Sequence, residues 1–181
     1  PEFTIEAWIN GTGGQPLDTT GTNGISGSIP LFSKGGPEQE SPIEVNMNYY
    51  LGLKTGKLVA DFEDNINGGN HPICGSTSIG SGWHHVAATY DGTTWALYVD
   101  GAAETLSAAC STCSGCTDIP GVAPVANSTQ HFALGTSLKT DGTPSGTTPG
   151  YYGGLLDEVR VWNVARTQSE IQAARYLELT S

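Results

Sequence analysis

The sequence predicts an all-β protein. Short segments in which apolar and polar residues alternate recur along the chain, and a period of two is typical of strands. Glycine is abundant, with 25 residues among 181, methionine occurs once, and helical periodicity is confined to the C-terminal segment. A chain of this length can bury a core of its own, so we expect one domain spanning residues 1–181.

The N-terminal half predicts four strands. The first is expected at residues 3–9, FTIEAWI, where alternate residues are apolar. A loop rich in glycine, threonine and asparagine over residues 10–28 leads to a second strand, SIPLFSKG, at residues 28–35. Residues 43–53 and 58–64 alternate in the same way, and the KTGK turn between them predicts a hairpin.

The middle of the chain predicts a three-stranded meander. GWHHVAATYDGTTWALYVDG, at residues 82–101, contains two strands joined by DGTT, and a turn at its end leads into AAETLSA. A long loop with cysteine and proline is expected over residues 107–130. HFALGTS, at residues 131–137, is a short strand, and another turn-rich loop follows at residues 139–150.

The C-terminal region predicts one strand and one helix. YGGLLDEVRVWN is the strand, at residues 152–163. The helix is expected in ARTQSEIQAARYL, where Thr167 and Glu170 have the spacing of a capping box. It is the one helix that the sequence supports.

Three separated segments resemble the LamG-like jelly-roll family of the concanavalin A-like lectin/glucanase superfamily, in order and in spacing. They are FTIEAWI, GWHHVAATYDGTTWALYVDG and YGGLLDEVRVWNVARTQSEI, and LFSKG and FALGTS are similar to the family's intermediate strands. The resemblance implies a jelly-roll sandwich of two antiparallel sheets with the first and last strands near each other. The cysteine-bearing insertion at residues 107–130 and the loop at 11–28 depart from the family pattern where the family varies.

Charge and termini narrow the range of partners. Eighteen acidic and seven basic residues give a net charge of −11, which disfavours nucleic acid and anionic membranes. No apolar run approaches the roughly 20 residues of a membrane helix, so membrane insertion is not expected. PEFTIEAWIN lacks a signal-peptide pattern and starts directly on a strand, so we expect a domain excised from a larger multidomain protein.

Four cysteines, Cys74, Cys110, Cys113 and Cys116, favour two disulfides in an extracellular or cell-surface setting. A zinc or iron–sulfur site from the C-x-x-C-x-x-C run and Cys74 is the alternative. The surrounding serine, threonine, glycine and proline favour the disulfides, and all three pairings stay open. A bridge from Cys74 to the cluster is the first expectation.

Adjacent His84 and His85 suggest a metal or catalytic pair, but they point to opposite faces of one strand and cannot grip one ion from it. We expect one to be half-buried between the sheets and the other to face solvent, both structural, as the resemblance also implies. If the terminal strands are adjacent, as the resemblance implies, Glu6 is expected to meet Arg160 across them as a structural pair. The tryptophans follow strand patterns and are expected in the core; they are Trp8, Trp83, Trp95 and Trp162.

Asp61 and Glu63 are the best candidates for a catalytic pair of carboxylates. They share a strand face at a spacing of roughly 6.6 Å, which is compatible with glycosidase chemistry. The superfamily's hydrolases, however, carry three carboxylates on one strand, whereas VADFEDN has two in alternation. A solvated strand end is therefore the favoured interpretation, and no catalytic residue is assigned. No G-x-S-x-G, zinc-protease or phosphate-loop motif occurs either.

Two kinds of binding site are expected near the strand ends. The resemblance implies calcium as the cofactor, and oxygen donors suit that ion; the candidate ligands are Asn10, Asp64, Asn67 and Asp157. For sugars, aromatic faces beside amides offer stacking and hydrogen bonds. The candidate sugar-binding residues are Asn46, Asn48, Tyr50, Tyr151 and Tyr152, of which each tyrosine also fits the core.

The sequence thus predicts a non-catalytic extracellular binding or adhesion module. Its expected partner is a glycan, or a cell-surface or matrix protein, bound through loops at the rim of the sandwich. A glycan-active hydrolase or lyase on the same scaffold is one alternative. The other is a structural spacer domain of a large surface protein, because one fold serves many functions.

Overall fold

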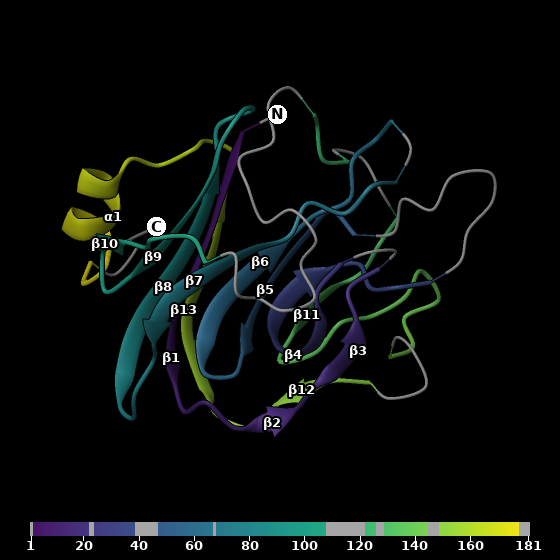
Figure 1. Cartoon of the computed structure of the whole chain (residues 1–181), viewed down its shortest axis with the longest axis horizontal. Helices are drawn as coiled ribbons and strands as arrows, with labels where there is room; N and C mark the ends of the chain where they lie inside the picture. Colours follow the sequence, from purple (N-terminus) through teal and green to yellow (C-terminus); the bar gives the residue numbers. More distant parts are fainter. Residues whose placement is uncertain are drawn as a thin grey trace.

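The computed structural model describes residues 2–21, 24–38, 47–66, 68–107, 122–125, 129–144 and 149–177. It confirms the all-β prediction: two antiparallel sheets face each other as a jelly-roll sandwich, and one short helix lies outside them (Figure 1). None of the helices in these ranges is long and apolar enough to cross a bilayer.

The first sheet has five strands in the order β10-β9-β8-β1-β13. Their bounds are β1 Phe3–Asn10, β8 Trp83–Tyr90, β9 Trp95–Val99, β10 Ala102–Ala103 and β13 Leu155–Trp162. The first and last strands pair along their length, and Glu6 lies opposite Arg160 in the register. The expected adjacency of the chain's terminal strands is therefore confirmed.

The second sheet has the order β11-β4-β5-β6-β7, with β3 paired to β4. Its strands are β3 Leu17–Thr19, β4 Ser26–Lys34, β5 Tyr49–Lys54, β6 Lys57–Asp61, β7 Ile73–Ser78 and β11 Phe132–Leu134. Positive φ angles of 50° at Thr55 and 74° at Gly56 make the β5–β6 connection the tight hairpin turn predicted from KTGK. A small ribbon pairs β2, Gly14–Gln15, with β12, Tyr151–Tyr152.

The strand β7 was not predicted. Its sequence, ICGSTS, is buried over its first three residues and exposed over the last three, so it lacks the alternation that marks a half-buried strand. Backbone pairing with β6 defines it instead, with a register shift between Lys57 and Val59.

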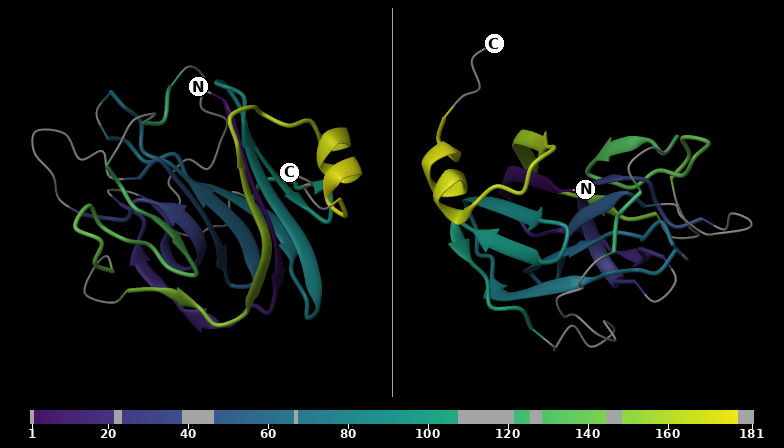
Figure 2. Two further views of the ribbon diagram at one scale, coloured as in Figure 1. Left: turned by 180° about the vertical axis from the view of Figure 1, so that it is seen from behind. Right: turned by 90° about the horizontal axis from the view of Figure 1, so that it is seen from above.

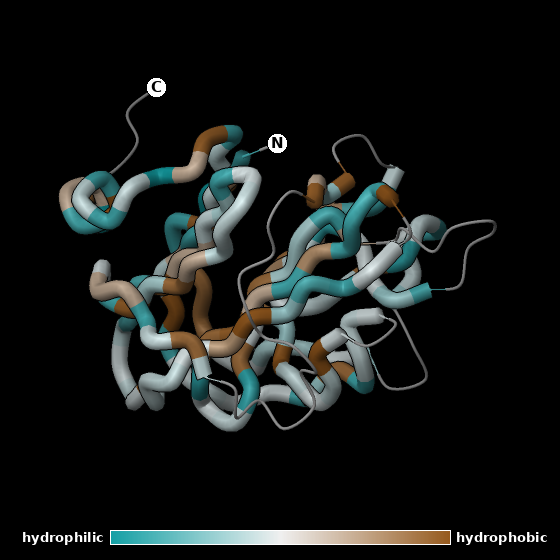
Figure 3. The backbone as a smooth tube through the Cα atoms, turned by 45° about the horizontal axis from the view of Figure 1, so that its top comes forward, coloured by the Kyte–Doolittle hydropathy of each residue, from teal (hydrophilic) through white to brown (hydrophobic). Residues whose placement is uncertain are grey.

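The main core fills the space between the sheets. The inward residues of β1 are Phe3, Ile5, Ala7 and Ile9, as the alternation predicted. At one end of the sandwich, the ring of Phe3 meets those of Phe62 and Trp95 at centroid distances of 6.4 and 5.2 Å. Apolar residues, brown in Figure 3, recur along the strands of both sheets.

A second apolar cluster covers the outer face of the six-stranded sheet. Tyr50 and Val59 point away from the main core and are buried against Leu17 of β3 and against Ile25 and Met47 from connecting segments. Strand β3 and connecting segments of the same chain therefore cover this face of the sheet. Residues that the sequence pattern placed on an open strand face are buried as a result.

The outer face of the five-stranded sheet is covered differently. Helix α1, Gln168–Ala174, lies against it (Figure 2). Both halves of the predicted Thr167–Glu170 capping box are present. Ile171 packs on this sheet beside Ala87 and Tyr98. The helix covers only one end of the sheet, and residues 175–177, which follow it, lie over the other end of that face.

A buried carboxylate on β1 binds the segment that connects β13 to α1. Glu6 is 1% exposed and accepts hydrogen bonds from Trp162 Nε1 at 2.8 Å and Arg166 Nη1 at 2.9 Å. Arg160 Nη1 lies 3.7 Å from the same oxygen, which confirms the predicted Glu6–Arg160 contact. Arg166, in the segment between β13 and α1, is the closer of the two arginines to Glu6.

We expect Glu6→Gln to lower the free energy of unfolding by about 3 kcal/mol, because two arginines would lose their buried counter-charge. Urea denaturation at pH 7 measures the change. Glu2→Gln, at an exposed position before β1, serves as the matched control and should stay within about 0.5 kcal/mol of wild type. Equal stabilities of the two variants would contradict this role for Glu6.

Candidate functional site

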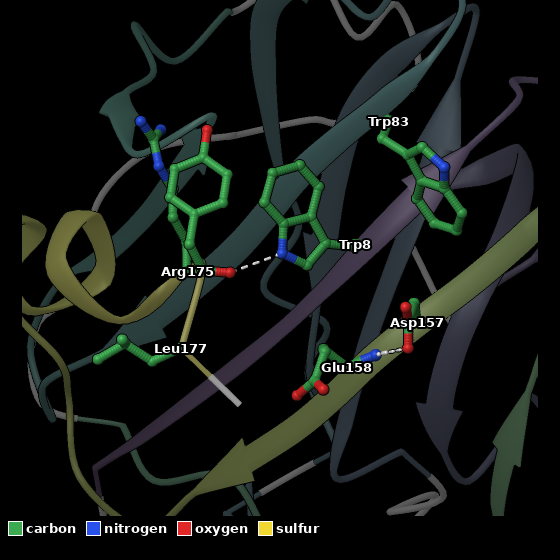
Figure 4. Close-up of a pocket in the computed structure, with 7 residues that line it drawn as sticks. Trp8, Trp83, Asp157, Glu158, Arg175 and Leu177 are labelled. Carbon is green, nitrogen blue, oxygen red and sulfur yellow. Dashed lines mark hydrogen bonds between the residues drawn. The ribbon is translucent and has the colours of Figure 1, made fainter. Parts of the chain in front are cut away.

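A pocket lies on the outer face of the five-stranded sheet, beside the chain that follows α1 (Figure 4). Its volume is about 370 Å³, within the usual range for small-molecule sites. Strands β1, β8 and β13 contribute its floor and one wall, and the C-terminal segment contributes the other wall. The lining residues are Trp8, Trp83, Asp157, Glu158, Arg175, Tyr176 and Leu177.

Trp8 forms the centre of the pocket and is held in place on several sides. Its Nε1 donates to the carbonyl oxygen of Arg175 at 2.7 Å. Its ring packs edge-on against His85 at 5.5 Å and tilted against Tyr176 at 5.3 Å. The one polar atom of this indole is therefore engaged within the protein, and the ring offers an apolar surface in a fixed position.

Trp83 stands at the start of β8 and is 45% exposed. The expectation that all four tryptophans lie in the core is therefore wrong for Trp83; Trp8 and Trp162 are partly buried, and Trp95 is the one in the core. Trp83 is on the outer face, at the end of the sheet that α1 does not reach. Alternation in the sequence marks a face but does not say what covers it.

A β-bulge brings two carboxylates to the pocket. Between the pairs Glu6–Arg160 and Trp8–Asp157, β1 has one residue and β13 has two. Glu158 lies in this bulge with φ at +48°, a conformation that costs a residue with a side chain about 1–3 kcal/mol. The alternation of β13 is broken here, so Asp157 and Arg160 lie on the same face of the sheet. Asp157 and Glu158 consequently line the same pocket.

The two carboxylates differ in their partners. Glu158 Oε2 accepts from Arg160 Nη2 at 2.6 Å and from Arg160 Nε at 3.1 Å. Asp157 Oδ1 accepts from the backbone N–H of Glu158 at 2.8 Å, and its side chain is exposed. Across the pocket, the Arg175 guanidinium lies over the Tyr176 ring at 4.8 Å. The site therefore combines indole faces, hydrogen-bond acceptors and one cation on the far wall.

Most of the residues predicted to bind sugar are not open to solvent. Tyr50 is fully buried, its hydroxyl lies 2.8 Å from Ser28 Oγ, and burial raises its pKa well above the usual range. Asn48 is buried, and Tyr152 is nearly so. Tyr151 is 58% exposed, on β12. Asn46 lies outside the described residues.

The residues predicted to bind calcium are not brought together. Asn10 and Asp157 lie at one end of the sandwich, where β1 ends and β13 begins. Asp64 follows Phe62 at the other end, roughly 23 Å away along β1, and its Oδ2 is 2.9 Å from His71 Nε2. Asn67 is outside the described residues. Within the described ranges, no three or more His, Cys, Asp or Glu side chains form a metal-binding group.

Asp61 and Glu63 are buried, at 0% and 1% exposure, so the expected solvated strand end is wrong. Thr20 Oγ1 donates to Asp61 at 2.5 Å, and the His71 backbone N–H donates to it at 2.9 Å. Glu63 accepts from the Met47 backbone N–H at 2.9 Å. The pair therefore fastens loops over β6 and is closed to a substrate. The signal that sequence reasoning lacked was the glycine-rich loop after Thr20, which covers them.

The histidine pair divides between the two faces of β8, as expected. His84 Nδ1 lies 2.8 Å from Asp100 Oδ2 at the end of the strand. His85 is buried, but beneath the C-terminal segment rather than between the sheets, and its Nε2 is 3.7 Å from Glu6 Oε2. Both positions support a structural role.

Only one of the four cysteines predicted to form disulfides lies within the described residues. Cys74 lies on β7 and is buried in the cluster outside the six-stranded sheet. Cys110, Cys113 and Cys116 lie outside the described residues. Their oxidation state and pairing stay predictions.

Comparisons with known proteins agree with this architecture. A family model described as "Concanavalin A-like lectin/glucanases superfamily" matches residues 1–172. A search of curated proteins finds no match.

Among solved structures, the chain is similar to a putative carbohydrate-binding protein from Bacteroides ovatus ATCC 8483, with a TM-score of 0.53 and 23% identity over 94% of this chain. It spans 40% of that protein's length. It is also similar to the CBM40 of the Ruminococcus gnavus IT-sialidase bound to α2,3-sialyllactose, with a TM-score of 0.56 and 14% identity, covering 95% of this chain and 81% of that one. At these identities the likeness shows the fold.

Two buried groups should give the stability of this protein opposing pH dependences. Burial, partly offset by hydrogen bonds from Thr20 and His71, raises the pKa of Asp61 from 3.8 to about 7, so the free energy of unfolding falls as pH rises between these values. Burial, aided by Arg160 and Arg175, lowers the pKa of His85 from 6.5 to about 4. Its contribution to the free energy of unfolding falls as pH decreases from 6.5 to 4.

Urea denaturation from pH 4 to pH 8 separates these effects through two variants. Asp61→Asn should make stability rise more steeply with pH than in wild type, because only the histidine contribution remains. His85→Gln should make stability fall with rising pH over the same window. Profiles parallel to that of wild type would contradict both assignments.

Proposed function

The chain belongs to the concanavalin A-like lectin/glucanases superfamily, and we propose that it is a non-catalytic carbohydrate-binding module whose ligand occupies the pocket beside Trp8 and Trp83. The exposure of Trp83 next to the immobilised ring of Trp8 is the observation that carries the proposal. Indoles with an open face pack against the apolar faces of sugar rings, while neighbouring polar groups fix their orientation.

The pocket is largely preformed, which favours binding because little ordering is needed. Trp8 is restrained by its hydrogen bond to Arg175 and by the flanking rings of His85 and Tyr176. Glu158 is restrained by Arg160. Asp157 and Trp83 remain at the rim, where a ligand can reach them from solvent.

The names of the structural neighbours support a carbohydrate ligand. The Bacteroides ovatus protein is described as a putative carbohydrate-binding protein, and the Ruminococcus gnavus module holds α2,3-sialyllactose. Both share the fold of this chain at low identity, so the pocket residues carry the argument for the site itself.

A hydrolase or lyase is the competing function, and the buried carboxylates argue against it. Asp61 and Glu63 accept hydrogen bonds from loops and lie outside the pocket. Within the pocket, Glu158 is paired with Arg160, and catalysis by Asp157 and Glu158 would require that pair to open. A structural spacer, the third class, needs neither an exposed indole nor a preformed pocket.

We also propose that the module works outside the cell or on its surface, with its cysteines oxidised. The proposal does not assign a calcium site, since the described residues predicted to bind calcium lie apart. Whether glycan binding depends on calcium is a question for experiment. The binding described above depends on the pocket's own side chains.

We expect Trp83→Ala to weaken glycan binding by about 30-fold or more, the loss typical of a buried aromatic anchor of about 2 kcal/mol. A glycan array identifies the ligand, and isothermal titration calorimetry then compares wild type with the variant. Tyr151→Ala removes a similarly exposed ring from β12, away from the pocket, and should bind like wild type.

Three outcomes would overturn the proposal or change its class. Tyr151→Ala as the more damaging variant would move the site to β12. Absence of any glycan ligand would leave a spacer or a protein-binding module. New reducing ends, released from a polysaccharide panel and lost in Asp157→Asn, would show an enzyme. Repeating the array with chelator tests calcium dependence.

We expect no titratable thiol in the unreduced, denatured protein and four after reduction. A colorimetric thiol assay in denaturant measures both values. Four thiols without reductant would contradict the two disulfides, and zinc or iron released in the same experiment would favour the metal–thiolate alternative.

A further inference from the structure

The chemistry of the pocket restricts the charge that a ligand can carry near Trp83. Asp157 and Glu158 stand on the β13 wall, and their side chains can only accept hydrogen bonds when ionised. Arg160 neutralises Glu158, whereas no cation contacts the Asp157 carboxylate among the interactions of the described residues. A ligand group placed here must therefore donate hydrogen bonds.

The cation of the pocket is held away from this wall. Arg175 stacks on Tyr176 at 4.8 Å, and Figure 4 shows Arg175 on the opposite side of Trp8 from Asp157. In the same view, Asp157 lies on the Trp83 side of Trp8, below both indoles. The Trp8 Nε1 donor is occupied by the Arg175 carbonyl, so it is not available to bind an anionic group beside Asp157.

We propose that the pocket selects a neutral hexopyranose, with two adjacent hydroxyls donating to the Asp157 carboxylate and one face of the ring packed on Trp83. A carboxylate with two oxygens matches a pair of neighbouring donors, and such charge-assisted hydrogen bonds are stronger than neutral ones. A uronic or sialic acid would bring a second negative charge without a donor to the same wall, and like charges at a binding site disfavour association.

This inference rests on the proposed carbohydrate-binding function and narrows it. It separates the chain from the Ruminococcus gnavus module, whose ligand is sialylated. The protein's net charge of −11 acts in the same direction, because it lowers the local concentration of anionic ligands around the whole molecule.

The test compares wild type, Asp157→Asn and the control Asp141→Asn, which alters an exposed aspartate bound within its own turn to Thr143. The probes are the methyl glycosides of glucose, galactose and mannose, methyl glucuronide, and α2,3-sialyllactose. Tryptophan fluorescence and calorimetry give each Kd at 20 mM and 500 mM NaCl.

For wild type we expect at least one neutral glycoside to bind at least 10-fold more tightly than either acidic sugar at low salt. Asp157→Asn should weaken that neutral ligand about 10-fold, in line with the loss of a hydrogen bond to a charged group, and should narrow the ratio between neutral and acidic sugars. High salt should narrow the ratio in wild type. Asp141→Asn should reproduce wild type.

The outcomes distinguish this proposal from the function on which it rests. If acidic sugars bind as tightly as neutral ones, or if the ratio is unchanged in Asp157→Asn, the selectivity is wrong while the carbohydrate-binding function stands. If Trp83→Ala and wild type both fail to bind every sugar, the function itself is wrong and the selectivity falls with it. The ratio between neutral and acidic sugars in wild type uses unmodified protein, so it tests the selectivity itself even if Asp157→Asn does not fold.

Discussion

The carboxylate of Glu6 is the interaction on which the rest of the site depends. A charge buried at 1% exposure is stable only when it is paired, and its partners come from the last strand and from the segment after it. Arg160 connects this pair to the pocket, because its guanidinium also binds Glu158 and the carbonyl oxygens of Ala174 and Leu177. One buried charge thus links the first strand, the last strand and both walls of the candidate site.

The outer faces of the two sheets explain where a ligand can bind. The six-stranded face is closed by Leu17 of β3 and by Ile25 and Met47 from the connections around it. On the five-stranded face, Ile171 buries one end and leaves the end near Trp83 without an apolar cover. The position of the binding surface is therefore determined by the segments that cover each outer face. The strands alone would allow a ligand to bind on either face.

Local patterns in the sequence predicted the elements well. The period of two in FTIEAWI, the KTGK turn and the Thr167–Glu170 capping box each depend on neighbouring residues, and each is found in the structure. The position of Glu6 opposite Arg160 followed from the resemblance. The burial of Tyr50 and Asp61 could not be predicted in this way, because it depends on loops contributed by distant residues such as Ile25 and Thr20. The bulge in LLDEVRVWN was not predicted, because charged and apolar residues alternate through this segment as they would in a regular strand.

Glu158 has a strained left-handed backbone, and its side chain lines the candidate binding pocket. Glycine adopts this conformation without strain, so Glu158→Gly would relieve the backbone at the bulge. The same replacement would remove the carboxylate that holds Arg160 beside the pocket wall. Arg160 is buried, and leaving it without its nearest counter-charge costs at least as much as the strain that glycine relieves. A library built on this scaffold should therefore hold that position constant.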